Sequence, residues 1–205
     1  MGPALSIRGI FIFSGFPTAG IRLAARCFGI TRKYPPHNVL IGHFTAAMAD
    51  MLPRPYQTAT FLREPIQRSL SMLGQFSRTM NVPVTALIED PRFMADNIAD
   101  FQTRILGADG VCDPHPFEGD DDTVLARAVA RLETLDFVGL TERFEESCAV
   151  FDARFRTGIS QFIRREVVHR PEGRELLEYS SRIEPFLERD RVLYEKAVAH
   201  FDAVV

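Results

Sequence analysis

Short apolar runs along the chain predict buried strands. Residues 9–13 (GIFIF) form the first run, the segment VLIGHF ends in Gly42-His43-Phe44, and Thr58–Leu62 precedes a turn. Runs of this length, rich in β-branched and aromatic residues, are typical of buried strands. Each is followed by polar or glycine-bearing residues, so each strand is expected to end in a loop.

Longer stretches have the spacing of helices. Behind the turn at residues 63–65 (REP), apolar residues recur at helical intervals, at Ile66, Leu70, Leu73 and Phe76. Proline is tolerated in the first turn of a helix because its missing amide would have no partner there. Further helices are predicted at IRLAARCFG (ended by Gly29), over residues 85–96, at TVLARAVARLETL, and between Glu172 and Phe201.

The stretch from Thr58 to Phe76 reads as strand, tight turn and helix, with Arg63 at the strand end and Ser71 about two helical turns later. In parallel α/β sheets, ligands bind outside the carboxyl ends of strands, where helix N-termini favour anions. A guanidinium can hold a phosphate through two N–H bonds, and a hydroxyl can add a third. The alternative is a surface Arg63–Glu64 pair and an ordinary helix serine.

A second candidate phosphate site follows the first predicted strand. The loop SGFPTAG lies between that strand and the helix IRLAARCFG. Strand, glycine-bearing loop and helix is the arrangement in which backbone amides and the helix dipole meet an anion. The alternative is that this unit serves only packing.

Composition narrows the classes of function. The chain has 205 residues, 46% hydrophobic content and a net charge of −3, which predicts one well-buried core and neither a nucleic-acid footprint nor a polybasic membrane patch. Cys27, Cys112 and Cys148 show no metal-ligand spacing and are expected to be inert thiols. No apolar run approaches the roughly 20 residues of a membrane span, so a soluble, cytoplasmic protein is expected. The acidic residues 120–122 favour a helix N-cap region over a cation site.

The segment LREPIQRSLSML resembles the LRDPVERxxSxY segment of sulfotransferases that use 3′-phosphoadenosine 5′-phosphosulfate (PAPS), especially the carbohydrate branch of the heparan-sulfate 2-O type. In that family the matching arginine and serine grip the 3′-phosphate, and here they are Arg63 and Ser71. Glu64 stands where aspartate is usual, and Met72-Leu73 replaces the aromatic residue that often follows the serine.

Other segments resemble the same family in the same order. The element GHF, about twenty residues before LREP, matches a family element whose histidine is the general base, which implies this role for His43. A purely structural histidine is the alternative. The stretch DNIADFQTRILGA resembles a family segment that lines the acceptor and cofactor cleft, which implies substrate binding by Asn97, Gln102 and Arg104. Solvated helix-surface contacts are the alternative for these polar residues.

The segment DFVGLTERFEES resembles the FVGLxERFxESL element, a short strand, a turn and a helix that would start near Thr141. The first loop departs from the family: FPTAGIRLA matches PKTAGTSL only if the lysine between Pro17 and Thr18 is absent. In the family this lysine stabilises charge on the leaving group. Arg22, Arg26 or Lys33 could partly substitute, although a guanidinium does not simply replace an ammonium.

The resemblance implies an α/β, P-loop-like three-layer fold, a parallel sheet flanked by helices, in a single sulfotransferase-like domain over residues 1–205. It implies transfer of a sulfuryl group from PAPS to a hydroxyl of a carbohydrate or related acceptor, without a metal. The loop Pro17-Thr18-Ala19-Gly20 would meet the 5′-phosphosulfate. A degenerate relative that binds nucleotide or glycan without turnover stays open, because the loop lysine is missing. A nucleotide-dependent kinase is disfavoured because GxxxxGK[ST] is absent.

Overall fold

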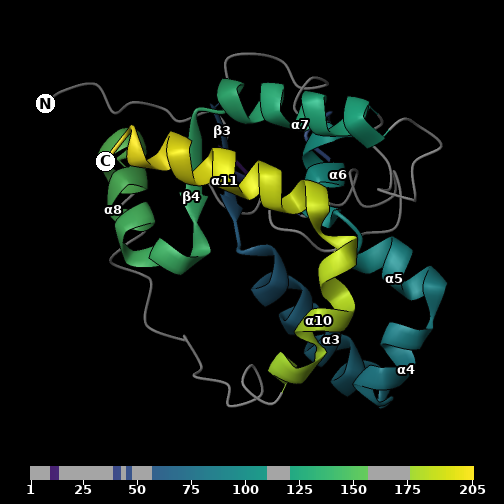
Figure 1. The fold of residues 1–205 in the computed structure, drawn as a ribbon. Coiled ribbons are helices and arrows are strands. Elements are labelled where there is room, and N and C mark those ends of the chain that lie inside the picture. Colours follow the sequence, from purple (N-terminus) through teal and green to yellow (C-terminus); the bar gives the residue numbers. More distant parts are fainter. Residues whose placement is uncertain (1–9, 14–38, 43–44, 48–56, 110–120, 157–175) are drawn as a thin grey trace, which may run out of the picture.

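Four parallel strands form one sheet in the order β2-β1-β3-β4. The computed structural model describes residues 10–13, 39–42, 45–47, 57–109, 121–156 and 176–205 (Figure 1). The strands are β1 (Ile10–Phe13), β2 (Val39–Gly42), β3 (Gln57–Leu62) and β4 (Phe137–Leu140). The three strands predicted from apolar runs, and the strand expected in DFVGL, are therefore confirmed, and the chain has an α/β fold.

Helices lie between β3 and β4 in the sequence and again after β4. They are α3 (Pro65–Met80), α4 (Val84–Glu89), α5 (Pro91–Asn97), α6 (Phe101–Gly107), α7 (Asp121–Thr134), α8 (Phe144–Phe155), α10 (Ser180–Ile183) and α11 (Glu188–Asp202), with short 3-10 turns at Thr141–Arg143, Leu176–Tyr179 and Glu184–Phe186. The predicted helices behind Pro65, in TVLARAVARLETL and in the described part of Glu172–Phe201 are confirmed. The helix expected at IRLAARCFG lies outside the described residues.

One helix expected over residues 85–96 is two helices. Pro91 lacks the amide that would continue α4, and the Asp90 carboxylate accepts hydrogen bonds from the Arg92 and Phe93 amides (2.9 and 3.1 Å), which starts α5 anew. A helix start near Thr141 is also corrected. A 3-10 turn occupies Thr141–Arg143, and α8 begins only at Phe144. The Thr141 hydroxyl donates instead to the Leu62 carbonyl (3.1 Å) and ties the end of β4 to the end of β3.

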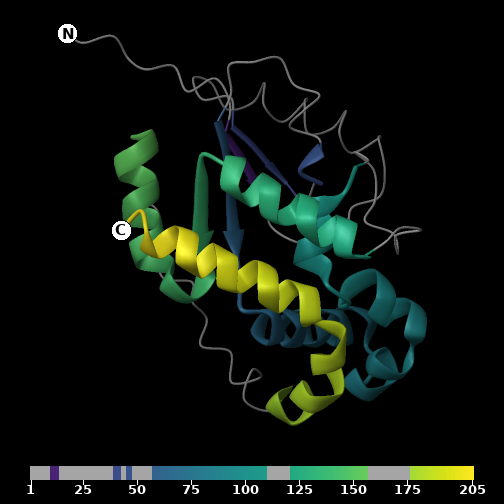
Figure 2. The ribbon, with the colours of Figure 1, turned by 45° about the horizontal axis from the view of Figure 1, so that its top comes forward.

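The main core lies between the sheet and the helices on either side of β3 and β4. Phe61 and Phe137 point to one face, where they pack against Phe151 of α8 with ring centroids 5.2 to 6.4 Å apart. Side chains alternate along a strand, so the buried Val138 and Leu140 point to the other face. Helices α7 and α11 contact each other and cross the sheet there (Figures 1 and 2).

A second apolar cluster holds together the helices beyond the carboxyl ends of the strands. It joins α3, α4, α5 and α10 through buried residues such as Leu73, Leu87, Met94 and Ile183. In Figure 2 this helical group lies at the end of the sheet toward which β3 points. Within the described residues, no helix is long and apolar enough to cross a membrane.

Candidate anion site at the carboxyl edge of the sheet

The strand order places a topological switch point between β1 and β3. The chain passes from β1 to β2 on one side and then to β3 on the other, with Ile12 of β1 in register with Ile41 of β2 and Ala59 of β3. In open parallel sheets of this kind, ligands bind in the crevice outside the strand ends at the switch point. Arg63 directly follows β3 at this edge.

The backbone of Arg63 is held by Gln102 of α6. The Arg63 amide donates to Gln102 Oε1 (2.9 Å), and Gln102 Nε2 donates to the Arg63 carbonyl (2.8 Å). Both ends of the side-chain amide are therefore bonded to one residue of the turn. The structure brings these two predicted site residues together, and it shows Gln102 fixing the turn from which the Arg63 side chain projects.

Glu64 and Glu142 fix the same turn from the other side. The Glu64 carboxylate accepts from the Ile66 and Gln67 amides (3.2 and 2.7 Å) and caps α3. Glu64 therefore supplies the N-cap carboxylate of α3. The Glu64 amide donates to Glu142 Oε1 (3.0 Å), and Tyr194 Oη donates to Glu142 Oε2 (2.7 Å).

Glu142 also faces the Arg63 side chain, with 4.0 Å between Arg63 Nε and Glu142 Oε1. Both side chains are about one-third exposed, so this ion pair is screened and weak, worth at most about 1 kcal/mol. Arg63 therefore keeps a partly exposed guanidinium that can bind a more highly charged anion. Ser71 lies on α3, about 9 Å along the helix axis from Pro65, and is exposed.

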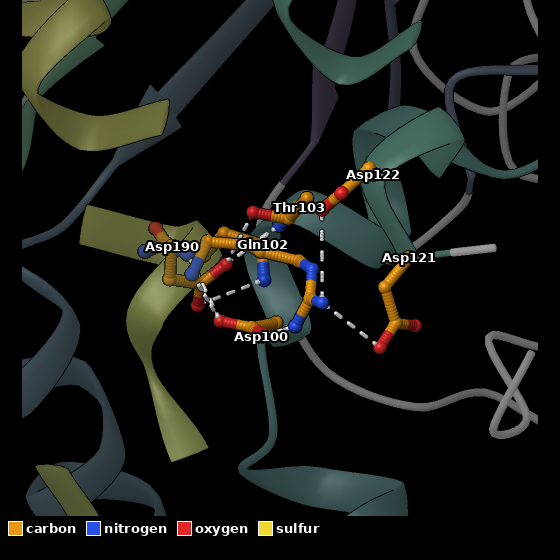
Figure 3. Close-up of polar contacts among 7 residues, drawn as sticks. Asp100, Gln102, Thr103, Asp121, Asp122 and Asp190 are labelled. Atoms are coloured by element: carbon orange, nitrogen blue, oxygen red, sulfur yellow. Dashed lines mark hydrogen bonds and ion pairs between the residues drawn. The ribbon is translucent and has the colours of Figure 1, made fainter. Parts of the chain in front are cut away.

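Behind this turn, two aspartates cap two helices. Asp190 accepts hydrogen bonds from the Gln102 and Thr103 amides (3.2 and 2.7 Å) and from the Thr103 hydroxyl (2.8 Å) at the start of α6. Asp100, which precedes α6, accepts from the Arg189 and Asp190 amides (2.9 and 3.0 Å) at the start of α11. Figure 3 shows the two carboxylates side by side with Gln102 and Thr103.

Burial shifts the pKa values of charged residues behind the Arg63 turn. Desolvation raises the pKa of the fully buried Asp190 carboxyl, while its bonds to Thr103 and the nearby Arg68 act in the opposite direction. Desolvation also lowers the pKa of Arg68, and the positive charges of Arg104 and Arg63 add to that shift. The guanidinium groups of Arg63 and Arg104 thus lie close enough to Arg68 to disfavour its positive charge. An anion at Arg63 would relieve part of this repulsion.

Asn97 and Arg104, the other predicted substrate residues, are buried at 8% and 7% exposure. Asn97 Nδ2 donates to the Phe93 backbone carbonyl (3.1 Å), and the Asn97 backbone carbonyl accepts from Arg68 Nη1 (2.7 Å). Arg104 Nη2 donates to the Asp96 carbonyl (3.1 Å). Arg104 lines a pocket beside α6, whereas these two hydrogen bonds of Asn97 are made to buried groups of the protein. Substrate binding by Asn97, Gln102 and Arg104 stays a prediction.

His43 and Pro17-Thr18-Ala19-Gly20 lie outside the described residues. The strands that precede them in sequence, β2 and β1, end at the same edge as β3, with Phe13 in register with Gly42.

No family model matches this chain, and no curated protein or solved structure is significantly similar to it. Within the described residues, no group of three or more histidine, cysteine, aspartate or glutamate side chains could hold a metal ion. The site must therefore be interpreted from its own geometry.

The site residues that were not singled out from the sequence include Glu142, Asp190 and Tyr194. The sequence position of Glu142 could have indicated its role. It is the second residue after β4, the strand next to β3, and the carboxyl ends of neighbouring parallel strands meet at one edge of the sheet. The sequence carries no such indication for Asp190 and Tyr194. Asp190 lies 88 residues from Gln102, and no local pattern connects them.

Proposed function

We propose that this protein is a PAPS-dependent O-sulfotransferase with a P-loop-like three-layer fold, acting on a hydroxyl of a carbohydrate or related acceptor. The observation that carries the proposal is the switch point between β1 and β3, with Arg63 directly behind β3 on a turn fixed by Gln102 and Glu142. A parallel sheet with a rigidly mounted arginine at its switch point is suited to a nucleotide phosphate. The segment LREPIQRSLSML supplies the family assignment.

Each site residue has a role in this scheme. Arg63 and the exposed Ser71 bind the 3′-phosphate, and the segment Pro17–Gly20 after β1 receives the 5′-phosphosulfate. His43, the residue after β2, accepts the proton of the acceptor hydroxyl. In-line transfer then forms the bond from the acceptor oxygen to sulfur and breaks the bond from sulfur to the 5′-phosphate oxygen, which keeps the electron pair. Such transfer depends on positioning and on neutralising the leaving group.

A second candidate function is binding of the nucleotide or a glycan without turnover. The loop after β1 lacks the lysine that neutralises the leaving group in the family, and Arg63 faces the carboxylate of Glu142 at 4.0 Å. A site that binds but does not catalyse is expected to keep Arg63 and Ser71 and to lose only the charge needed in the transition state.

The experiment is calorimetric titration of the full chain with 3′-phosphoadenosine 5′-phosphate (PAP). Saturable binding is expected, at least tenfold weaker in Arg63→Ala and in Ser71→Ala, since a hydrogen bond to a charged group is worth about 1.5 to 3 kcal/mol. Arg78→Ala, in the last turn of the same helix, is the matched control and should bind like the wild type. Absence of PAP binding, or equal binding by Arg63→Ala, overturns the proposal.

Turnover separates the two functions. Transfer of radiolabelled sulfate from PAPS to a panel of glycans, lost in His43→Ala while PAP binding survives, supports the transferase. PAP binding without transfer to any glycan supports the binding protein. Full activity in His43→Ala would show that another residue is the base.

A further inference from the structure

A pocket of about 280 Å³ lies between α5, α6, α7 and the start of α11. Arg104, Arg189, Asp121, Val124 and Phe186 are among the described residues that line it. The Asp100 amide donates to the Phe186 carbonyl (2.9 Å), so the 3-10 turn that carries Phe186 is fixed to the residue before α6. Arg63 is not among the described lining residues, so this pocket is considered apart from the anion site at β3.

Arg104 contributes a buried, incompletely bonded cation to the pocket wall. Its side chain is 7% exposed, and its Nε is buried with no hydrogen-bond partner among the described residues. A buried N–H without a partner is destabilising, because it has lost its hydrogen bond to water. Burial lowers the pKa of Arg104, and the negative charges of Asp190 and Asp96 oppose that shift. A guanidinium carries five donors, so Arg104 has capacity for a ligand.

Arg189 adds a second guanidinium, already shared among carboxylates. Its Nη1 lies 3.2 Å from Asp100 Oδ2, and its Nη2 lies 3.1 Å from Asp121 Oδ2 (Figure 3). Its Nε is also buried without a partner among the described residues. The two aspartates make the pocket unfavourable for a dianion such as phosphate, because each would repel it, whereas a monoanion at Arg104 meets less repulsion.

Val124 and Phe186 favour an apolar surface on the ligand. Val124 is buried and Phe186 is 40% exposed, and both line the pocket. Ligand pockets for drug-sized molecules span about 300 to 1,000 Å³, so this smaller pocket suits a single ring.

We propose that this pocket binds the carboxylate of a small organic acid about the size of one six-membered ring, with Arg104 holding the carboxylate and Phe186 covering a face of the ring. Arginine and carboxylate pair through two parallel N–H bonds, and the Arg104 guanidinium in the pocket lining carries donors for such a pair. Asp121, whose side chain is 59% exposed, competes with the ligand for positive charge. The proposal rests on the pocket alone and does not require PAPS binding.

The test is NMR titration of the full chain with D-glucuronate and with benzoate, each beside a neutral counterpart, D-glucose and benzamide. At least one acid should bind saturably and at least tenfold more tightly than its neutral counterpart. Glucuronate alone indicates a sugar acid, benzoate alone an aromatic acid, and both a general carboxylate site. Failure of both acids, or equal binding of acid and neutral counterpart, overturns the proposal.

Two variants with opposite expected effects separate ligand contact from loss of structure. Arg104→Met keeps an apolar side chain near Phe101 and should weaken acid binding at least tenfold, while Asp121→Asn should strengthen it about threefold by removing a nearby negative charge. Arg154→Met, exposed on α8, is the control and should bind normally. Should Arg104→Met not fold, Asp121→Asn decides: unchanged or weaker binding contradicts the proposal. Arg63→Ala should leave acid binding intact, which separates this site from the PAP site.

Discussion

Asp100, which precedes α6, caps α11, and Asp190, in the first turn of α11, caps α6. The Asp100 carboxylate accepts hydrogen bonds from two backbone amides of α11. The Asp190 carboxylate accepts hydrogen bonds from two backbone amides of α6 and from the Thr103 hydroxyl. The first amides of a helix have no partner inside it, so each aspartate satisfies groups that would otherwise be buried and unbonded. Because Gln102 is one of the capped residues and also holds Arg63, this pair supports the anion site.

Removing either aspartate should destabilise the protein, and the two losses should be coupled. Asp190→Ala leaves three buried donors without an acceptor and should lower the free energy of unfolding by about 3 kcal/mol. Asp100→Ala should lower it by about 2 kcal/mol. In urea unfolding, the double variant should lose less than the sum of the single losses by at least about 0.5 kcal/mol.

Asp90→Ala is the control. It removes the exposed cap of α5 and should lower the free energy of unfolding by about 1 kcal/mol without coupling to Asp190. Strict additivity would show that the caps act independently.

Gln102→Leu should show how much PAP binding depends on the backbone support of Arg63, because it leaves the Arg63 side chain in place. The variant leaves the Arg63 amide and carbonyl without their partner, which should lower the unfolding free energy by about 1 to 2 kcal/mol. PAP binding should weaken about fivefold, because the guanidinium is mounted on a looser turn. Calorimetry on the folded variant measures this. Gln75→Leu, exposed on α3, is the control and should bind PAP normally. Wild-type affinity in Gln102→Leu would mean that the turn holds itself.

Tyr194 should make the stability of the protein depend on alkaline pH. Burial, and then the hydrogen bond to Glu142, raise its pKa above the usual value of about 10. A phenol with a raised pKa in the folded protein holds its proton more tightly than in the unfolded chain. Its contribution is therefore complete below about pH 10 and is lost as the pH rises further.

Thermal unfolding between pH 8 and 11 measures this effect. Tyr194→Phe should be less stable than the wild type at pH 8, and the difference should shrink toward pH 11. Tyr179→Phe provides a comparison, because the Tyr179 pKa is also raised but its nearest carboxylate is Glu178 instead of Glu142. A constant difference in stability between wild type and Tyr194→Phe across this pH range would contradict a raised pKa of Tyr194 in the folded protein.

Gly107→Ala should destabilise the contact between α6 and α7. A Cβ built on Gly107 would overlap the Val124 carbonyl oxygen, a backbone atom that cannot turn away as a side chain can. Overpacking of this kind costs about 1 to 3 kcal/mol, and the upper part of that range is expected. Urea unfolding measures it, with Gly74→Ala as the control, since the nearest atom there is the end of the Leu176 side chain. Wild-type stability would show that α7 can shift freely.

The sheet was predictable from the sequence because its strands are short, apolar and bounded by turn residues. β1, β2 and β3 follow directly from GIFIF, VLIG and TATFL. The turn at Arg63 and the helix behind Pro65 were predictable for the same reason, since the proline and the apolar spacing are local signals. The break at Asp90-Pro91 was missed although Pro91 signals it, because the apolar spacing continues across the break.

The polar layer behind Arg63 was not predictable. Gln102 and Arg104 were expected to face a ligand, but their burial depends on α6 lying between α7 and α11, a packing that no local pattern encodes. Thr141 was expected to begin a helix, but its hydroxyl donates to Leu62 across the sheet, because strand pairing brings the Leu62 carbonyl within reach. The burial and hydrogen-bond partners of such side chains are set by tertiary contacts.

The reciprocal caps also have a consequence for the order of events during synthesis. Gln102 and Asp190 are 88 residues apart, so at roughly 5 to 20 residues per second about 4 to 18 s pass between their additions to the chain. During that time α6 has no Asp190 to accept its first amides, and Gln102 has a poorly anchored helix from which to hold Arg63. The nascent chain can form its sheet early, but the Arg63 turn is expected to become rigid only after α11 has been made.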